Sequence, residues 1–196
     1  MSTTEDIKKL RFKTSAGMME CKDALKESNG DIDKAIEILR KKGITKAAKK
    51  ASRIAGQGII ETYVHTGGRI GVMLEVNCET DFVARNNEFK QLTKDLAMQV
   101  AAANPVYVSR EEIPKEILEK EREIFASQIK DKPDNVVEKI VEGKITKYFS
   151  ETCLLEQPFI KDPDKKVNEL VASAIATLGE NIVIKRFKRF EVGEEF

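Results

Sequence analysis

The chain changes from a strand pattern to a helix pattern within ten residues, Asn77-Cys78-Glu79-Thr80-Asp81-Phe82-Val83-Ala84-Arg85-Asn86. The residues before this stretch alternate between apolar and polar side chains, and the residues after it have the period of an amphipathic helix. A short polar turn with one large aromatic side chain, Phe82, lies between them. Binding residues are often held at such junctions on the rim of a rigid scaffold, so we expect this turn to contact another protein.

Two strand patterns come before the helix and predict a β-hairpin. They cover residues 59–65 and 70–78, and Gly67 and Gly68 lie in the loop between them. Two glycines can adopt the positive φ angles of a two-residue type I′ turn. That turn would place Tyr63 opposite Val72 and Glu61 opposite Leu74. One face of the hairpin is then apolar and is expected to face the core; its residues are Ile59, Tyr63, Ile70, Val72, Leu74 and Val76.

Helical patterns dominate the chain after the turn. A helix is expected from residue 86 or 87 to Pro105, since proline interrupts helices. Ser109 and Glu112 have the spacing of a capping box, which predicts a second helix that ends near Lys130. With a third helix over residues 135–149, it would form an antiparallel helical hairpin against the sheet.

The C-terminal part predicts one more helix and one more strand. The helix covers residues 167–178 and ends at Gly179, and the strand covers residues 181–192. Basic residues in this strand are typical of a sheet edge that is protected from aggregation, although the strand could equally pair with a partner strand. Helices grouped around a small antiparallel sheet make an α+β domain, which we assign to residues 58–196.

The first 43 residues predict a compact module of three short helices, the last of which ends at Gly43. This module resembles the ubiquitin-associated-like fold and would be marginally stable alone. Met18 and Met19 are adjacent, and neighbouring helical side chains diverge by roughly 100°. We therefore expect one of them in the core and the other exposed; the alternative is that both pack internally.

A basic connector, residues 44–57, joins the module to the α+β domain. Residues 1–57 hold 14 Lys and Arg against 8 Asp and Glu, although the whole chain has a net charge of only +1. The connector could contact RNA, but no aromatic side chains are interleaved with its charges for base stacking. A solvated linker helix is the favoured interpretation, and no direct nucleic-acid contact is expected.

The reactive side chains of the sequence do not indicate an enzyme. The chain has one histidine, His65, and three widely spaced cysteines, so it offers no metal cluster, disulfide framework or catalytic triad. His65 is expected at the surface. Without a signal peptide or a run of membrane-spanning length, the protein is expected to be cytoplasmic.

Several motifs resemble one protein family. The N-terminal motifs are Ile7-Lys8-Lys9-Leu10-Arg11, Thr14-Ser15-Ala16-Gly17-Met18-Met19-Glu20-Cys21-Lys22 and Asn29-Gly30-Asp31. The later ones are Leu74-Glu75-Val76-Asn77-Cys78-Glu79-Thr80-Asp81-Phe82-Val83-Ala84-Arg85, Gln157-Pro158-Phe159 and Arg189-Phe190-Glu191-Val192-Gly193. Together they resemble the signatures of bacterial translation elongation factor Ts, with Ser15 where glycine is common.

This resemblance implies a function and a set of site residues. Family members are guanine-nucleotide exchange factors for the GTPase elongation factor Tu, and no cofactor is expected in the factor itself. The block Thr80, Asp81, Phe82 and Val83 is implied to dislodge Mg²⁺ from the partner. Contacts with the GTPase domain are implied for Arg11, Met18, Met19 and Lys22.

The chain is shorter than many members of this family. Longer members carry two related core subdomains and a protruding coiled coil, whereas only one hairpin-and-helix unit is visible in this sequence. Short members are thought to compensate by dimerising. We therefore expect a homodimer that binds two partner molecules, with the terminal strand or its neighbours at the interface. A ubiquitin-type adaptor and an RNA-binding accessory factor are the remaining alternatives.

Overall fold

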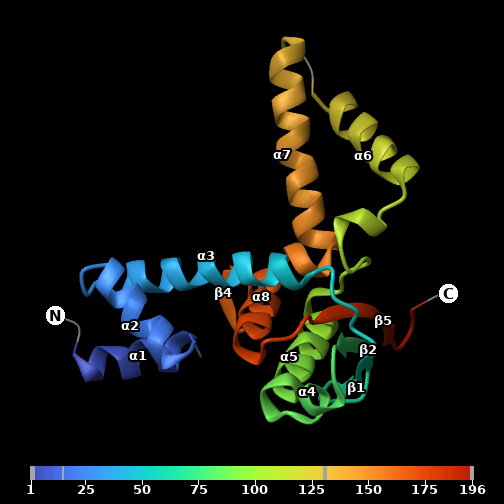
Figure 1. Cartoon of the computed structure of the whole chain (residues 1–196). Helices are drawn as coiled ribbons and strands as arrows, with labels where there is room; N and C mark the ends of the chain where they lie inside the picture. Colours follow the sequence, from blue (N-terminus) through green and yellow to red (C-terminus); the bar gives the residue numbers. More distant parts are fainter. Residues whose placement is uncertain (1–2, 15, 130–131, 195–196) are drawn as a thin grey trace.

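The computed structural model describes residues 3–14, 16–129 and 132–194 and has the predicted α+β fold (Figure 1). A long helix, α3 (Ile32–Lys50), connects the N-terminal helices α1 (Thr4–Thr14) and α2 (Met18–Glu27) to the body of the molecule. Helices α6 (Lys115–Ser127) and α7 (Asp134–Thr152) project from the body in another direction. The molecule is therefore a body with two extensions.

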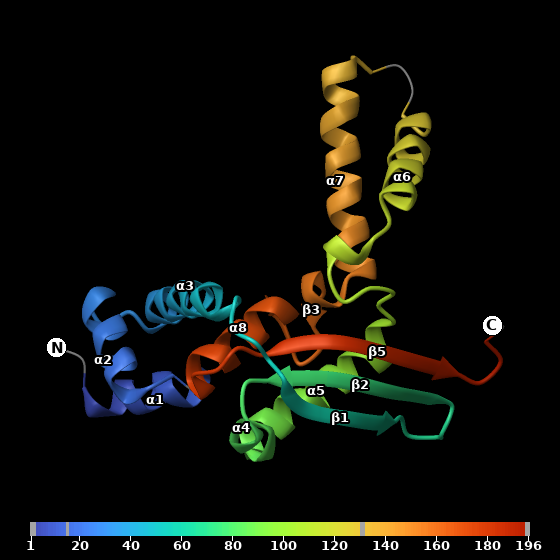
Figure 2. The ribbon, with the colours of Figure 1, turned by 45° about the vertical axis from the view of Figure 1, so that its right-hand side comes forward.

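The body is built on an antiparallel sheet in the order β1-β2-β5 (Figure 2). Its strands are β1 (Gln57–Val64), β2 (Ile70–Cys78) and β5 (Val183–Glu191). The predicted register is confirmed, because Tyr63 pairs with Val72 and Glu61 with Leu74. The prediction that the last strand lies at an edge is also confirmed, since β5 pairs only with β2 in the described sheet.

The predicted turn type of the hairpin is wrong. Gly67 and Gly68 both have positive φ, at 94° and 70°. However, the Gly68 N–H donates to the carbonyl of His65 at 2.9 Å, and the His65 N–H donates to the carbonyl of Ile70 at 2.9 Å. The two strands are therefore joined by a four-residue loop in place of a two-residue turn, and the register is unchanged.

Two helices pack on one face of the sheet and enclose the main core. Helix α5 (Asn87–Ala103) lies directly on β1 and β2, and α8 (Val167–Leu178) packs beside it and against α3. Their bounds agree with the predicted helices, and Gly179 caps α8 with a φ of 81°. The largest fully buried apolar side chains of this core are Phe89, Leu74, Leu96, Leu154, Val76, Val100 and Val167.

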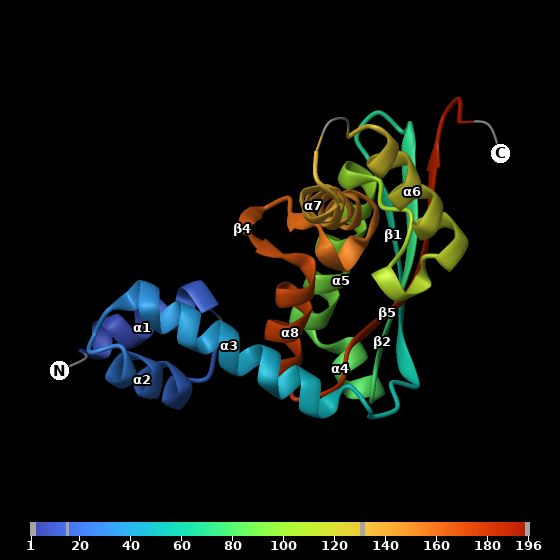
Figure 3. The same ribbon diagram turned by 90° about the horizontal axis from the view of Figure 1, so that it is seen from above.

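The N-terminal helices have a separate, smaller core. It consists of Leu10, Cys21, Ala24, Leu25 and Ala35, which are all fully buried. Figure 3 shows α1 and α2 at the far end of α3, away from the sheet. A three-helix module is thus confirmed as a structural feature, and the division of the chain at residues 43 and 57 stays a prediction.

The prediction that Gly43 ends a helix is wrong, because α3 continues to Lys50. Gly43 is buried where α3 meets α8, and a Cβ at this position would lie 3.9 Å from the carbonyl oxygen of Ala172. Glycine inside a helix costs about 1 kcal/mol relative to alanine, and the packing of α3 along α8 offsets this cost. The connector is helical to Lys50 and most of its residues are exposed, but it is not solvated on all sides, because Ala47 packs against the main core and α3 lies along α8.

The helical hairpin α6–α7 is present, but it does not lie against the sheet as predicted. It stands away from the body, and its base is held by residues next to α7 (Figures 1 and 2). The Leu154 N–H donates to the carbonyl of Tyr107 at 2.9 Å, and the Arg110 guanidinium lies 4.8 Å from the centre of the Phe149 ring. The helices α6 and α7 are therefore a pair that projects from the body.

The predicted capping box at the start of this hairpin is wrong. Ser109 makes no capping hydrogen bond from its side chain, and Glu112 accepts from the Val108 N–H at 2.9 Å. The Glu112 N–H donates to the carbonyl of Ser109 at 3.3 Å, and this segment forms the short 3₁₀ helix η1 (Arg110–Glu112) ahead of α6. Helix α6 ends at Ser127, and the predicted end at Lys130 lies outside the described residues.

Three short elements between α7 and α8 were not predicted. They are η2 (Leu154–Glu156), β3 (Pro158–Phe159) and β4 (Asp162–Lys166). The two strands pair antiparallel and lead directly into α8. Their sequence has too few alternating apolar residues to predict a strand.

Candidate functional site

Phe82 lies on a short helix, α4 (Asp81–Arg85), where the sequence predicts a turn. Thr80 is the N-cap residue, and its hydroxyl accepts a hydrogen bond from the Val83 N–H at 3.4 Å. Asp81 lies in the first turn, where a carboxylate is favourable, and it forms an ion pair with Arg85 at 2.9 Å. The four predicted residues of the block therefore belong to one capped helical turn.

The side chains of this block point in different directions. Val83 is half-buried against the main core, and the neighbouring Ala84 is buried. Phe82 is 80% exposed, although a phenyl ring is among the most apolar groups in the chain. An exposed aromatic side chain on an anchored turn is suited to insertion into a partner protein.

Two carboxylates tie this turn to the other end of the chain. Glu180 accepts hydrogen bonds from the backbone N–H groups of Glu79 and Thr80 at 3.1 and 3.0 Å. In return, Glu79 accepts from the backbone N–H of Asn181 at 2.7 Å. The thiol of Cys78 lies 3.1 Å from the carbonyl oxygen of Thr80 and donates to it. The start of α4 is thus held by hydrogen bonds in both directions: Glu180 accepts from the turn, and Glu79 of the turn accepts from Asn181.

The N-terminal site residues form a second exposed group on α1 and α2. Arg11, Met18, Met19 and Lys22 are all exposed, with 57% of Met18 and 64% of Met19 accessible. The expectation that one of the two methionines lies in the core is wrong, as is the alternative that both are internal. Both residues stand in the first turn of α2, and the core begins one turn later, at Cys21.

The structure does not bring the two groups together. Glu20, next to Met19, pairs with Lys46 of α3, whereas the turn before α4 lies beyond the end of α3, where Arg53 forms an ion pair with Glu79 at 3.6 Å. Figure 3 shows α1 and α2 on one side of α3 and α4 beside the sheet. The two groups can act together only on a partner that reaches both.

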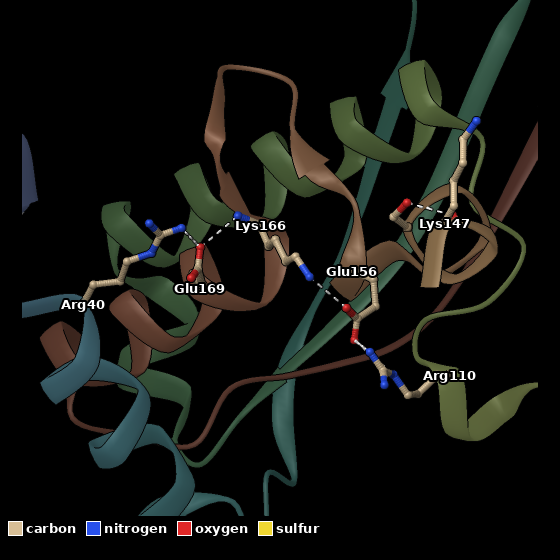
Figure 4. Close-up of polar contacts among 7 residues, drawn as sticks. Arg40, Arg110, Lys147, Glu156, Lys166 and Glu169 are labelled. Carbon is tan, nitrogen blue, oxygen red and sulfur yellow. Dashed lines mark hydrogen bonds and ion pairs between the residues drawn. The ribbon is translucent and has the colours of Figure 1, made fainter. Parts of the chain in front are cut away.

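A chain of ion pairs fixes α3 on the body (Figure 4). Arg40 of α3 pairs with Glu169 of α8, and Glu169 also accepts from the backbone N–H of Lys166 at 2.9 Å. The ammonium group of Lys166 lies 3.2 Å from Glu156, which pairs with Arg110 at 2.6 Å. These contacts connect α3 to the base of the α6–α7 hairpin.

These contacts lower the pKa of the two carboxyl groups. Burial by itself would raise the pKa of Glu169, but the hydrogen bonds from Arg40 and Lys166 and their positive charges outweigh it. Burial acts in the same direction on Glu156, and Arg110 and Lys166 again hold its pKa below the usual value. Both carboxylates are therefore stabilised in the charged form.

The remaining reactive side chains do not form a metal site in the described part of the chain. No group of three or more His, Cys, Asp and Glu residues there could hold a metal ion. The three cysteines are buried, and burial raises the pKa of each thiol, which makes the thiols poor nucleophiles. His65 is exposed and contacts the Tyr63 hydroxyl at 3.0 Å. Among the described helices, none is long and apolar enough to cross a membrane.

Sequence reasoning did not identify Glu180, Asn181 or the Arg40–Glu169 pair. The residues after Gly179 have the pattern of a helix stop and a turn, which indicates local structure only. Glu180 is 100 residues from Thr80 in the sequence, and no local spacing relates the two. By contrast, the sequence indicated the exposed group on α1 and α2 through its two adjacent methionines, Met18 and Met19.

Comparisons with known proteins give one consistent result. A family model described as Elongation factor TS matches residues 1–194. Elongation factor Ts from Carboxydothermus hydrogenoformans is 60% identical over 196 residues, which cover 99% of this chain and 90% of that protein. Elongation factor Ts from Thermodesulfovibrio yellowstonii is 61% identical over 193 residues, covering 98% of this chain and 96% of that protein.

A further relative comes from Thermotoga sp. strain RQ2, whose elongation factor Ts is 60% identical over 190 residues, or 97% of this chain and 96% of that protein. These relatives are nearly the same length as this chain, so the short form is common to all of them. Since both the family model and the relatives match almost the whole sequence, the chain belongs to the elongation factor Ts family of translation elongation factors.

Proposed function

We propose that the protein is the guanine-nucleotide exchange factor for elongation factor Tu and is not itself an enzyme. In this proposal it binds the GDP complex, disturbs the Mg²⁺ and phosphate site of the partner, and promotes the replacement of GDP by GTP. The observation that carries the proposal is Phe82, an 80% exposed aromatic side chain on a helix whose start is anchored on both sides.

The mechanism depends on how the partner holds its nucleotide. Mg²⁺ requires near-ideal octahedral geometry, so a small displacement of its surroundings weakens the site strongly. Burial of a phenyl side chain in a groove of the partner contributes about 1.5–3 kcal/mol, which can offset part of the cost of this displacement. Asp81 would perturb charges near the ion, while Thr80 and Val83 hold the turn in position.

The exposed group on α1 and α2 supplies a second contact. Methionine side chains adapt to irregular surfaces, and Met18 and Met19 are flanked by the positive charges of Arg11 and Lys22. This group would hold the partner while Phe82 acts on it. Coupling between factor and nucleotide is reciprocal, so the factor accelerates exchange without selecting GTP over GDP.

The basic residues of the connector favour a structural role over RNA binding. Within residues 44–57, Lys46 pairs with Glu20 and Arg53 lies 3.6 Å from Glu79, and just before them Arg40 and Lys42 pair with Glu169 and Glu27. Charges that are already paired are less available to phosphates. We therefore propose a cytoplasmic protein whose partner is a GTPase and which makes no direct contact with nucleic acid.

We also propose a homodimer that binds two partner molecules. The outer face of the sheet exposes apolar side chains from all three strands: Ile60, Val64, Met73 and Phe190. A second copy of the same face would bury them and would involve the terminal strand β5. Analytical ultracentrifugation should give a dimer at micromolar concentration, and Met73→Lys should shift it toward monomer. A monomeric wild type would contradict the dimer.

Stopped-flow release of fluorescent GDP from elongation factor Tu tests the exchange function. At saturating factor, Phe82→Ala should slow release about 10- to 100-fold, which corresponds to the loss of about 1.5–3 kcal/mol. Val106→Ala is the matched control, because Val106 is 63% exposed and lies beyond the other end of α5, about 25 Å away. Release by Phe82→Ala at the wild-type rate would reject the proposed role of this residue.

A further inference from the structure

Both carboxylate oxygens of Glu180 accept hydrogen bonds from the turn before α4. Its Oε2 accepts from the backbone N–H groups of Glu79 and Thr80 at 3.1 and 3.0 Å. Its Oε1 accepts from the Thr80 hydroxyl at 2.6 Å. One side chain thus receives three hydrogen bonds from two consecutive residues, which fixes the backbone that leads to Phe82.

Glu180 is itself held rigidly. It follows Gly179, whose φ of 81° allows the chain to reverse at the end of α8. The next residue, Asn181, is 4% exposed and donates through its side chain to the carbonyl of Arg53 at 2.8 Å. Its backbone N–H donates to Glu79 at 2.7 Å. The carboxylate therefore projects from a corner that is fastened to α3, α8 and the turn.

Helix α4 needs an external anchor. It has five residues, and helices of this length are not stable by themselves because nucleation is unfavourable. The hydroxyl of Thr80 caps the helix through the Val83 N–H at 3.4 Å, and the same hydroxyl donates to Glu180. The contact with Glu180 thus also orients the group that caps α4.

We infer that Glu180 is a positioning residue for nucleotide exchange: through Thr80 it fixes α4 so that Phe82 projects in one direction when the partner is bound. The inference rests on the proposed function. Without the carboxylate, the N–H groups of Glu79 and Thr80 and the Thr80 hydroxyl would donate to water and no longer to an acceptor that is fixed in position. Helix α4 then adopts several orientations, and only a fraction of the bound complexes has Phe82 in the competent one.

This role predicts a specific kinetic signature. The N-terminal group is held on α3 by other contacts, such as the Lys46–Glu20 pair, and should still bind the partner, so the half-saturating concentration should change by less than about twofold. The maximal rate of GDP release should fall about tenfold in Glu180→Ala, since hydrogen bonds to a charged group are among the stronger ones. Glu180→Gln should be intermediate, because its amide retains one acceptor oxygen.

The experiment compares Glu180→Ala, Glu180→Gln, Phe82→Ala and the double variant Phe82→Ala/Glu180→Ala in the GDP release assay. Glu142→Ala is the control, because this carboxylate pairs with Arg122 at 2.6 Å on the projecting hairpin. Hydrogen exchange of the Glu79 and Thr80 amides in the free protein reports the anchor without the partner. Both amides should exchange faster in Glu180→Ala and stay protected in the control.

A reduced maximal rate with unchanged half-saturation, and no further loss in the double variant, would support the inference. A wild-type maximal rate in Glu180→Ala would overturn the inference. It would also be overturned if Glu180→Ala reduced the maximal rate of Phe82→Ala by the same factor as that of the wild type. If Phe82→Ala is slow and Glu180→Ala is fast, only the positioning role fails. If the wild-type factor does not accelerate release, the proposed function fails as well. If circular dichroism shows that Glu180→Ala is unfolded, the maximal rate and half-saturation of Glu180→Gln test the inference in its place.

Discussion

The two groups of proposed contact residues are built in opposite ways. Phe82 stands on a five-residue helix that is anchored by hydrogen bonds to residues 100 positions later in the chain. Met18 and Met19 stand on a module with only five fully buried core residues, at the far end of α3. Phe82 is therefore held by contacts with the body of the molecule. Met18 and Met19 belong to a small module that can adapt.

This difference matches the two tasks in the proposed mechanism. A residue that displaces groups around Mg²⁺ must not give way, which requires a rigid support. Residues that hold a partner surface benefit from flexible side chains. Four changes to the molecule, described from the largest expected effect to the smallest, test whether rigidity and adaptability are divided in this way.

Removing the support beneath α4 should have the largest effect. Phe89 is fully buried in the first turn of α5, directly after α4. Phe89→Ala should reduce the free energy of unfolding by about 3–5 kcal/mol through lost burial and a cavity. Urea denaturation followed by circular dichroism measures it. A loss below about 1 kcal/mol would show that the body is not the rigid part.

Weakening the N-terminal module should have a smaller and more local effect. Leu25 is fully buried in its core, and Leu25→Ala should cost about 2–4 kcal/mol. Because the module has its own core, hydrogen exchange should lose protection in α1 and α2 but keep it in β1 and β2. The half-saturating concentration in exchange should rise while the maximal rate is retained. Equal loss of protection in the sheet would mean that the two regions unfold together.

Shortening the exposed methionines should affect binding alone. Met18→Ala or Met19→Ala should each weaken partner affinity by about 1 kcal/mol, roughly fivefold, since each side chain loses part of its buried area in the complex. The melting temperature should not change because both side chains are exposed. Titration calorimetry measures the affinity, with Ile124→Ala on the projecting hairpin as control. An unchanged affinity in both variants would remove these residues from the contact.

Acidification should have the smallest effect, at the joint between the two regions. The pKa of Glu169 is lowered in the folded protein from a value of 4.5. Its contribution to stability is therefore complete above pH 4.5 and is lost as the pH falls through the lower, folded-state pKa. The loss should be about 1 kcal/mol or less, which is the usual contribution of a partly exposed ion pair. Glu169→Gln should remove this part of the pH dependence of urea unfolding, and identical profiles for both proteins would contradict the assignment.

Local patterns in the sequence predicted much of the body. Alternation and the position of the glycines gave the register of Tyr63 opposite Val72, and Gly179 marked the end of α8. Such signals act over a few residues, so they can be found in one sequence. They also placed Phe82 between a strand and a helix, although it lies on the short helix α4 and not on the predicted turn.

The errors arose where distant contacts determine the structure. Gly43 resembles a helix stop, but α3 continues through it and packs along α8. The direction of the α6–α7 hairpin depends on backbone contacts between residues 107 and 154. Glu180 carries no local motif at all. The proposed site could thus be located from the sequence, whereas its anchor required the fold.

The contact between Glu180 and Thr80 also has a consequence for the order of folding during synthesis. Chains emerge from the N-terminus, and units with local contacts can fold first. The N-terminal module needs only the first half of α3 to close its core. Helix α4 is made early but receives its anchor only when residue 180 appears, and β5 completes the sheet later still. A newly made chain would acquire its N-terminal contact surface first, and the proposed exchange function would require residue 180 and β5 to have been made as well.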